Sequence, residues 1–133
     1  MYKIPASTLF VGKNLVFMTE CHSTNSDALE LCQQSSLVPE GTVVITDNQT
    51  AGRGQRGNQW TTAPGNNFTF SILFKPSFLS IRDQFYLNVF TSLSIYDYLL
   101  EKGCNTIRIK WPNDIYLGSK KICGILIENV ITG

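Results

Sequence analysis

The amino-acid sequence predicts an α+β fold, in which two helices pack against a largely antiparallel mixed sheet. Three observations predict it: short apolar runs rich in β-branched residues, one long stripe of apolar residues at helical spacing, and a two-residue glycine turn between strand-like segments. The 133 residues are 43% hydrophobic and 16% charged, which is typical of one globular domain with a single core.

The first part of the chain predicts a strand, a helix and a second strand. Residues 15–18 are apolar and predict a short strand, and the polar run after Ser23 is typical of a helix N-terminus. The helix is expected over residues 25–34, where apolar residues recur at helical spacing. Residues 42–46 are apolar or β-branched and predict a buried strand.

A long polar segment and the longest helix follow. Residues 47–67 hold four glycines, two arginines and almost no aliphatic side chain, so a loop is expected there, before a strand over residues 68–74. Apolar residues then recur every three or four positions over residues 86–100. Ser80 and Asp83 form a capping-box pattern before this helix, and Gly103 stands just past its end.

The C-terminal part predicts three strands, over residues 108–111, 115–117 and 121–130. The last two are joined by Gly118 and Ser119, a two-residue turn with glycine first, as type II′ requires. Such a turn pairs Tyr116 with Lys121 and places Asp114 diagonally across from Lys121 on the same face. A carboxylate and an ammonium are therefore expected side by side.

Charge and cysteine usage exclude several classes of function. Eleven basic and ten acidic residues nearly balance, so the sequence predicts neither a nucleic-acid partner nor a membrane partner, and any anion site must be local. Four separated cysteines and one histidine do not make a zinc site, and they favour free thiols. With no membrane-span or signal-peptide pattern, a cytoplasmic location is expected.

Three groups of residues are candidates for chemistry. The segment Gly52 to Trp60 interleaves glycines with arginines, a pattern that suits phosphate or carboxylate; the alternative is a solvated surface loop. The pair Asp114 and Lys121 could share an anionic ligand, and the alternative is a surface ion pair. Hydroxyls at the predicted helix start and the amide just before the glycine loop form the third group, with helix capping and solvation as the alternatives: Ser23, Thr24 and Gln49.

Four motifs carry a specific resemblance: Ser23-Thr24-Asn25, then Gln49 with Gly52-Arg53-Gly54 through Trp60, then Lys110-Trp111-Pro112-Asn113-Asp114, then Lys121-Ile122-Cys123-Gly124-Ile125-Leu126. In this order they closely resemble the catalytic domain of biotin protein ligases, over residues 15–127. The resemblance implies a class II synthetase-like biotin/lipoate ligase fold. It also implies activation of biotin with ATP and Mg²⁺ to biotinyl-5′-AMP, and transfer of biotin to a lysine of a carboxylase's biotin carboxyl-carrier domain.

The resemblance also implies roles for individual residues. Biotin would be bound by Ser23, Thr24, Asn25, Gln49, Gly52, Arg53, Gly54, Gln55, Lys121 and Gly124. ATP would be bound by Arg53, Arg56, Trp60, Asn113, Asp114 and Lys121. The catalytic residues would be Lys121, Arg53 and Asp114, with no dedicated metal site and Mg²⁺ arriving with ATP near Asp114. We expect these side chains to converge on one pocket.

Two departures from the family pattern stand out. The family's glycine loop commonly reads Gly-Arg-Gly-Arg-x-Gly-Arg, whereas Gln55 and Asn58 occupy the second and third arginine positions here. Residues 1–133 are expected to be a partial catalytic domain, without the later strands and small C-terminal domain of the family and without a helix-turn-helix before residue 15. Two alternatives remain open: a non-catalytic fragment that binds biotin or its adenylate, and a relative that handles lipoate or octanoate.

Overall fold

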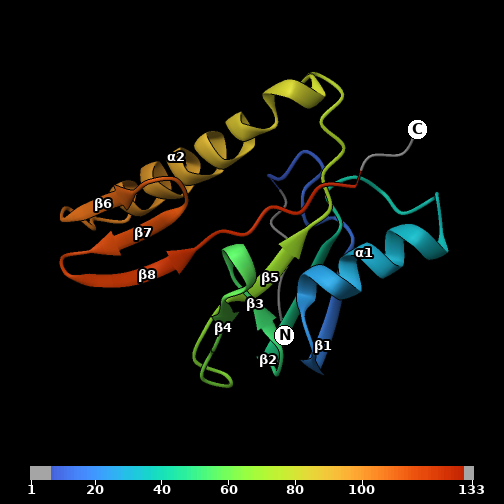
Figure 1. Cartoon of the computed structure of the whole chain (residues 1–133), viewed down its shortest axis with the longest axis horizontal. Helices are drawn as coiled ribbons and strands as arrows, with labels where there is room; N and C mark the ends of the chain where they lie inside the picture. The colour runs from blue at the N-terminus through green and yellow to red at the C-terminus, as the bar shows by residue number, and fades with distance from the viewer. Residues whose placement is uncertain (1–6, 131–133) are drawn as a thin grey trace. The chain divides into compact units, whose positions relative to one another are not determined.

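The computed structural model describes residues 7–130 and confirms the α+β class. The chain divides into two compact units, residues 1–76 and 77–133. Its strands are distributed over three hydrogen-bonded sheets rather than one, and all pairings are antiparallel except that of β1 with β2. Helix α1 belongs to the first unit and helix α2 to the second (Figure 1).

The first unit is a β–α–β crossover with an added strand. Strand β1 (Leu15–Cys21) runs parallel to β2 (Val43–Gln49), and β5 (Thr69–Ile72) pairs antiparallel with β2. Helix α1 (Thr24–Gln34) connects β1 to β2 and contacts β2 and β5 (Figure 1). The sheet is centred on β2, its most buried strand, in which Val44 is fully buried and Ile45 nearly so.

The segment expected to be a loop is partly a hairpin. Strand β2 continues to Gln49 because Cys21 of β1 still pairs with it. Beyond it, β3 (Gly52–Arg53) pairs with β4 (Gln59–Trp60), and a 3-10 turn (Gln55–Gly57) joins them. Strands of two residues have no alternation of apolar and polar side chains, so the sequence pattern could not reveal them.

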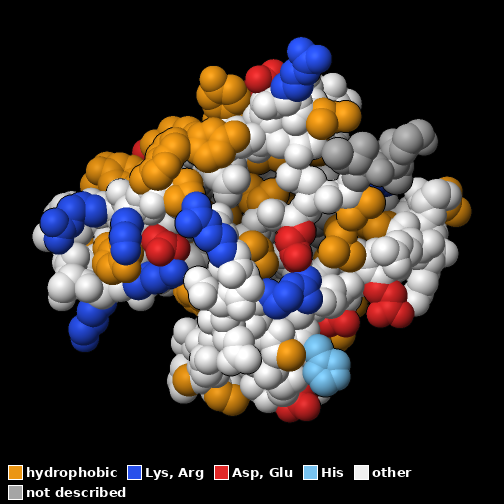
Figure 2. Space-filling model, viewed as in Figure 1, with side chains coloured by type: hydrophobic (Ala, Val, Ile, Leu, Met, Phe, Trp, Pro, Cys, Tyr) orange, Lys and Arg blue, Asp and Glu red, His pale blue; other side chains and the backbone are white. Residues whose placement is uncertain are grey.

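The second unit is a three-stranded antiparallel sheet under a helix. Helix α2 (Phe85–Glu101) contacts β6 (Ile107–Lys110) and β7 (Asp114–Leu117), and β7 lies between β6 and β8 (Lys120–Gly124). The core residues of this sheet are Ile107, 7% exposed, and Ile115, fully buried. Figure 2 shows further hydrophobic side chains gathered on the surface over α2, among them Tyr86, Phe90 and Leu93.

The helix ends show one correct prediction and one wrong one. Gly103 has a φ of +87°, and the N–H groups of Gly103 and Cys104 bond back to Leu100 and Leu99, a Schellman end as expected. The Ser80–Asp83 pattern does not cap α2: the Ser80 hydroxyl bonds the Asp83 carboxylate at 2.9 Å and closes a separate 3-10 turn (Ile81–Asp83). Helix α2 itself has no side-chain cap.

The last predicted strand is too long. Strand β8 ends at Gly124, whereas residues 125–130 form no strand. A β-bulge in β8, opposite the step from Ile115 to Tyr116 of β7, precedes this end. Just past this end, the Ile125 N–H bonds the backbone carbonyl of Asn113, and the Asn113 side chain bonds the Ile125 carbonyl.

Candidate functional site

The N-terminus of α1 is capped by a side chain from a distant strand. The Oε1 atom of Gln49 accepts a 3.0 Å hydrogen bond from the Thr24 backbone N–H. Ser23 occupies the N-cap position and is 3% exposed, but its hydroxyl makes no capping bond. The expectation that Ser23 or Thr24 caps the helix is therefore wrong. The Gln49 amide takes that place because β2 ends beside the helix start.

Hydroxyl and amide groups join this helix end to β5. Thr24 Oγ1 lies 2.8 Å from Ser71 Oγ, and Ser71 also donates to the Asn25 side-chain carbonyl. Both Thr24 and Ser71 are buried, so the network is shielded from water. Sequence reasoning singled out Thr24 and Asn25 but missed Ser71, because a serine inside a strand carries no motif.

The glycine hairpin lies beside the same helix end. A Cβ atom at Gly52 would collide with the Gln49 amide and the Trp60 carbonyl oxygen, so only glycine fits this position. Ala51 N–H donates to the His22 carbonyl at 2.8 Å, which keeps the segment against the chain before α1. Arg53, an exposed residue, donates from Nη1 to Ser26 Oγ at 2.5 Å. Ser26 was not predicted to take part.

The tip of the hairpin is more open. Arg56 adopts a left-handed conformation, with φ +56° and ψ +35°, which is unusual for a residue other than glycine. Gly54 N–H bonds the Asn58 carbonyl at 2.7 Å, and Gln55 lies between them in the 3-10 turn. Trp60 pairs across the hairpin with Gly52 and is partly buried. The arginine-glycine segment is thus a folded hairpin with Arg53 at its base and Arg56 at its tip.

In the second unit the predicted hairpin register is confirmed. Tyr116 pairs with Lys121, and Gly118 has the positive φ, +60°, that the predicted turn needs. Lys121 Nζ lies 2.7 Å from Asp114 Oδ1, and the two side chains are 32% and 22% exposed. The carboxylate and ammonium that the sequence placed side by side therefore form a half-buried ion pair.

This ion pair lies on a cationic face of the sheet. The register puts the alternate side chains of β6, β7 and β8 on one face: Arg108, Lys110, Asp114, Tyr116 and Lys121. The other face carries the buried isoleucines that pack under α2. Figure 2 shows Lys and Arg side chains clustered around these strands with a single acidic group among them. An anionic ligand is favoured on such a surface.

The bulge changes what stands opposite Asp114. Because Ile122 is the extra residue, Cys123 pairs with Ile115 and Gly124 pairs with Asp114. Burial raises the pKa of the Cys123 thiol, while the Lys121 ammonium opposes this rise. A glycine, with no side chain, therefore stands across from the Asp114 carboxylate.

Asn113, predicted to contact ATP, has a structural partner. It is 7% exposed, its side-chain N–H₂ donates to the Ile125 carbonyl, and its own carbonyl accepts from the Ile125 N–H at 3.1 Å. Ser92 of α2 donates to the carbonyl of Pro112, the preceding residue, at 3.3 Å. These bonds hold the start of β7 and hence the position of Asp114.

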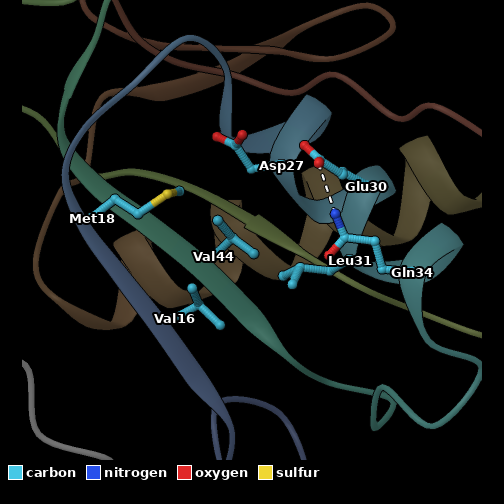
Figure 3. A pocket seen from close by; sticks show the side chains of 7 residues that line it. All are labelled: Val16, Met18, Asp27, Glu30, Leu31, Gln34 and Val44. Carbon is cyan, nitrogen blue, oxygen red and sulfur yellow. Dashed lines mark hydrogen bonds between the residues drawn. The ribbon is translucent and has the colours of Figure 1, made fainter.

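A cavity of about 180 Å³ lies between α1 and the sheet, and no motif pointed to it (Figure 3). Its apolar side is formed by residues of β1, β2 and α1: Val16, Met18, Val44 and Leu31. Its polar side comes from α1: Asp27, Glu30 and Gln34. Asp27 also bonds the Cys21 thiol, and burial together with this carboxylate raises the pKa of Cys21 to about 11.

The described residues contain neither a metal-binding cluster nor a membrane-spanning helix. Within residues 7–130, no three His, Cys, Asp or Glu side chains group closely enough to hold a metal ion. No helix in that same range has the length and apolarity to cross a membrane. All four cysteines are free thiols, as expected.

The structure therefore groups the predicted residues into two clusters. The helix-end cluster, in the first unit, comprises Ser23, Thr24, Asn25, Gln49, Gly52, Arg53 and Gly54, with Gln55, Arg56 and Trp60 on the same hairpin. The hairpin cluster, in the second unit, comprises Asn113, Asp114, Lys121 and Gly124. Convergence of the two clusters on one pocket stays a prediction.

Curated relatives share this part of their sequence. The chain is 33% identical over 121 residues to the bifunctional ligase/repressor BirA of Bacillus subtilis, covering 91% of this chain and 36% of the relative. It is 34% identical over 114 residues to the biotin--[acetyl-CoA-carboxylase] ligase of Paracoccus denitrificans, covering 84% and 45%. The chain thus spans less than half the length of these relatives.

Solved structures agree in fold. The biotin protein ligase of Leishmania major in complex with biotinyl-5-AMP matches with a TM-score of 0.76 and 27% identity, over 90% of this chain and 53% of that one. The Aquifex aeolicus biotin protein ligase in complex with biotin and ATP matches with a TM-score of 0.69 and 34% identity, over 88% and 47%. The family model for the biotin/lipoate A/B protein ligase family matches residues 18–133. This match covers most of the chain, which therefore belongs to the biotin/lipoate A/B protein ligase family.

Proposed function

We propose that the chain carries the biotin-activating residues of a biotin protein ligase, which forms biotinyl-5′-AMP from biotin and ATP. The biotinyl group then passes to a lysine of a biotin carboxyl-carrier domain. The observation that carries the proposal is the 2.7 Å Asp114–Lys121 pair on a cationic sheet face. The ligands of two similar structures, biotinyl-5-AMP in one and biotin with ATP in the other, support it.

The helix-end cluster is assigned to biotin. Ser23, Thr24 and Gln49 offer hydroxyl and amide groups suited to a urea-like ring, and Asn25 adds a second amide. The base of the glycine hairpin is assigned to the carboxylate and the α-phosphate, through the Arg53 guanidinium and the backbone around it: Gly52, Gly54 and Gln55. Arg56 and Trp60 are assigned to ATP.

The hairpin cluster is assigned to the reacting groups. Lys121 would hold the biotin carboxylate against the α-phosphate, and Asp114 would orient the Lys121 ammonium or the incoming lysine. Gly124 leaves room across from Asp114. Asn113 would act on ATP mainly by holding Asp114, because its amide is bonded to Ile125.

The reaction needs positioning and charge stabilisation rather than a covalent enzyme intermediate. A biotin carboxylate oxygen attacks the α-phosphorus of ATP, a P–O bond breaks, and pyrophosphate leaves. The lysine amine of the carrier domain then attacks the carbonyl of the mixed anhydride, loses a proton, and AMP leaves as the amide forms. Guanidinium and ammonium groups stabilise the negative charge that grows on the phosphorus oxygens.

Mg²⁺ would fit this arrangement as an ion that binds together with ATP. Within the described residues no acidic trio exists to hold it, and Asp114 is the one carboxylate on the cationic face. Mg²⁺ commonly binds through phosphates, water and one or two carboxylates. Bound there, it would neutralise charge on the leaving pyrophosphate.

The test is adenylate formation by the 133-residue chain with biotin and α-labelled ATP, followed by chromatography. Formation of biotinyl-AMP and pyrophosphate supports the proposal. Biotin binding by calorimetry without adenylate formation would instead support a non-catalytic binding fragment. The remaining candidate is a relative that handles lipoate or octanoate, because the family includes lipoate ligases. Competition among biotin, lipoate and octanoate tests it. Preference for lipoate or octanoate would overturn the proposed substrate.

A further inference from the structure

Ser92 of α2 contacts the turn that leads into Asp114. It is 2% exposed, and its hydroxyl donates to the Pro112 carbonyl at 3.3 Å, across 20 positions of sequence. No motif marks Ser92, and the proposed function gives it no role. We propose that Ser92 is a positioning residue, which fixes the start of β7 so that the Asp114 carboxylate meets the Lys121 ammonium during biotin activation. This inference rests on the proposed function.

The turn needs such a partner because strand pairing does not reach it. Residues 111–113 form a turn between β6 and β7, and the ladder of these two strands closes at the pair Lys110–Asp114. Proline has no backbone N–H, so Pro112 can form backbone hydrogen bonds only through its carbonyl. The Ser92 hydroxyl is the donor that α2 supplies for this carbonyl.

A second contact holds the same helix to the same turn. The ring centroids of Phe85 and Trp111 lie 5.0 Å apart, with the ring planes at 47°. Phe85 and Ser92 are about two helical turns apart, so both stand on one face of α2. The helix therefore contacts two successive residues of the turn, by ring packing at Trp111 and by a hydrogen bond at Pro112.

The residue after Pro112 fixes the other side of the turn. The side-chain N–H₂ of Asn113 donates to the Ile125 carbonyl, and its own carbonyl accepts from the Ile125 N–H at 3.1 Å. Asp114 follows directly, and one of its carboxylate oxygens lies 2.7 Å from Lys121 Nζ. A displaced turn would therefore move this carboxylate, and a shift of about 1 Å at a reacting site can slow a reaction about 100-fold.

The experiment measures kcat for biotinyl-AMP formation and the KM for biotin. Ser92→Ala should lower kcat about 3- to 10-fold, the factor that corresponds to one hydrogen bond between uncharged groups. The KM for biotin should stay nearly unchanged, because the biotin ring is assigned to the helix-end cluster. Ser94→Ala is the matched control: this exposed serine of the same helix also donates to a backbone carbonyl, that of Phe90, at 2.8 Å. Its kcat should equal that of the unmutated chain.

A double-mutant cycle separates positioning from a general structural effect. Asp114→Asn removes the charge that Ser92 is proposed to place, so Ser92→Ala should lower kcat no further in that background. A purely structural role would give the same fractional loss in both backgrounds. Ser92→Cys is similar in size and keeps a weak donor, so its kcat should lie between those of Ser92→Ala and the unmutated chain.

Each failure has a separate meaning. An unchanged kcat in Ser92→Ala, with kcat lowered in Asp114→Asn, would overturn the role of Ser92 alone, and so would equal losses in Ser92→Ala and Ser94→Ala. Absence of biotinyl-AMP from the unmutated, folded chain would instead overturn the proposed function and this inference together. Circular dichroism and thermal unfolding check that each variant is folded, and Ser92→Cys replaces Ser92→Ala in the cycle if the alanine variant does not fold.

Discussion

The helix-end cluster and the hairpin cluster are held by different kinds of contact. Around the start of α1, the bonds Thr24–Gln49, Arg53–Ser26 and Thr24–Ser71 join residues 25, 27 and 47 positions apart. In the β7–β8 hairpin, Asp114 and Lys121 are seven positions apart and one turn sets their register. Closing a longer loop costs more conformational entropy, although the cost rises slowly with length.

The two clusters should therefore be disrupted by different kinds of substitution. The helix-end cluster depends on side chains from α1, β2, β3 and β5 being in place together, and its bonds are between neutral groups apart from Arg53. The hairpin cluster depends on one turn, one ion pair and one buried asparagine. Changes to backbone fit should therefore damage the first cluster, and changes of charge should damage the second.

The largest expected effect comes from a charge change in the hairpin cluster. Lys121→Met should slow biotinyl-AMP formation by about 10²- to 10³-fold, the usual effect of removing one preorganised donor. The free energy of unfolding should change by less than about 1 kcal/mol, because the ion pair is only half buried. Lys120→Met, which removes a neighbouring exposed lysine, is the control. Equal rates in both variants and the unmutated chain would remove Lys121 from the mechanism.

The next-largest expected effect is on the rate at which cysteine thiols of the two regions are alkylated. With its pKa at about 11 rather than 9.0, Cys21 at pH 8 has roughly a hundredfold less thiolate than an ordinary thiol. Its alkylation by iodoacetamide, followed by mass spectrometry, should be at least that much slower in the folded chain than in the chain unfolded in guanidinium. Since folding favours the protonated thiol, this contribution to stability is complete below about pH 9 and is lost between pH 9 and 11.

Two variants make the thiol comparison more specific. Asp27→Asn should speed alkylation of Cys21, because the Asp27 carboxylate helps to raise the pKa of that thiol. Lys121→Met should slow alkylation of Cys123, because the Lys121 ammonium lowers the pKa of Cys123 against the effect of burial. If both variants changed the rate in the same direction, the two thiols would not have the opposite electrostatic surroundings described above.

Backbone fit at the helix-end cluster is tested by two glycines of the same hairpin. Gly52→Ala should destabilise the chain by about 1–3 kcal/mol, because the new methyl group overlaps the Gln49 amide and the Trp60 carbonyl. Gly54→Ala should cost less, since a Cβ there meets Asn58 at ordinary contact distance, 3.4 Å, and φ is −108°. Urea unfolding measures both. Similar losses in the two variants would contradict a close approach specific to Gly52.

The smallest expected effect is loss of the long-range cap. Gln49→Ala removes the acceptor for the Thr24 N–H and should lower the free energy of unfolding by about 1 kcal/mol, as other N-cap losses do. Gln59→Ala, at an exposed strand position, should have little effect and serves as the control. Equal stability of the two variants, measured by urea unfolding, would mean that the Gln49 contact contributes nothing.

The hairpin cluster is the part of the site that sequence reasoning described well. Alternating strands and the Gly118-Ser119 turn are local signals, and they correctly placed Lys121 opposite Tyr116 and beside Asp114. The bulge at Ile122 and the bonds of Asn113 were missed, because nothing in the local pattern says where a ladder is interrupted.

The amino-acid sequence by itself determined the α+β class, the main helices and strands, the family motifs and the register of one hairpin, since each depends on spacing over a few residues. Tertiary structure alone decided that Gln49 caps α1, that Ser26 contacts Arg53, and that Gly52 has no room for a side chain. Those contacts join segments that only become neighbours when β1 and β2 pair and α1 packs on them. Their partners therefore cannot be read from local spacing.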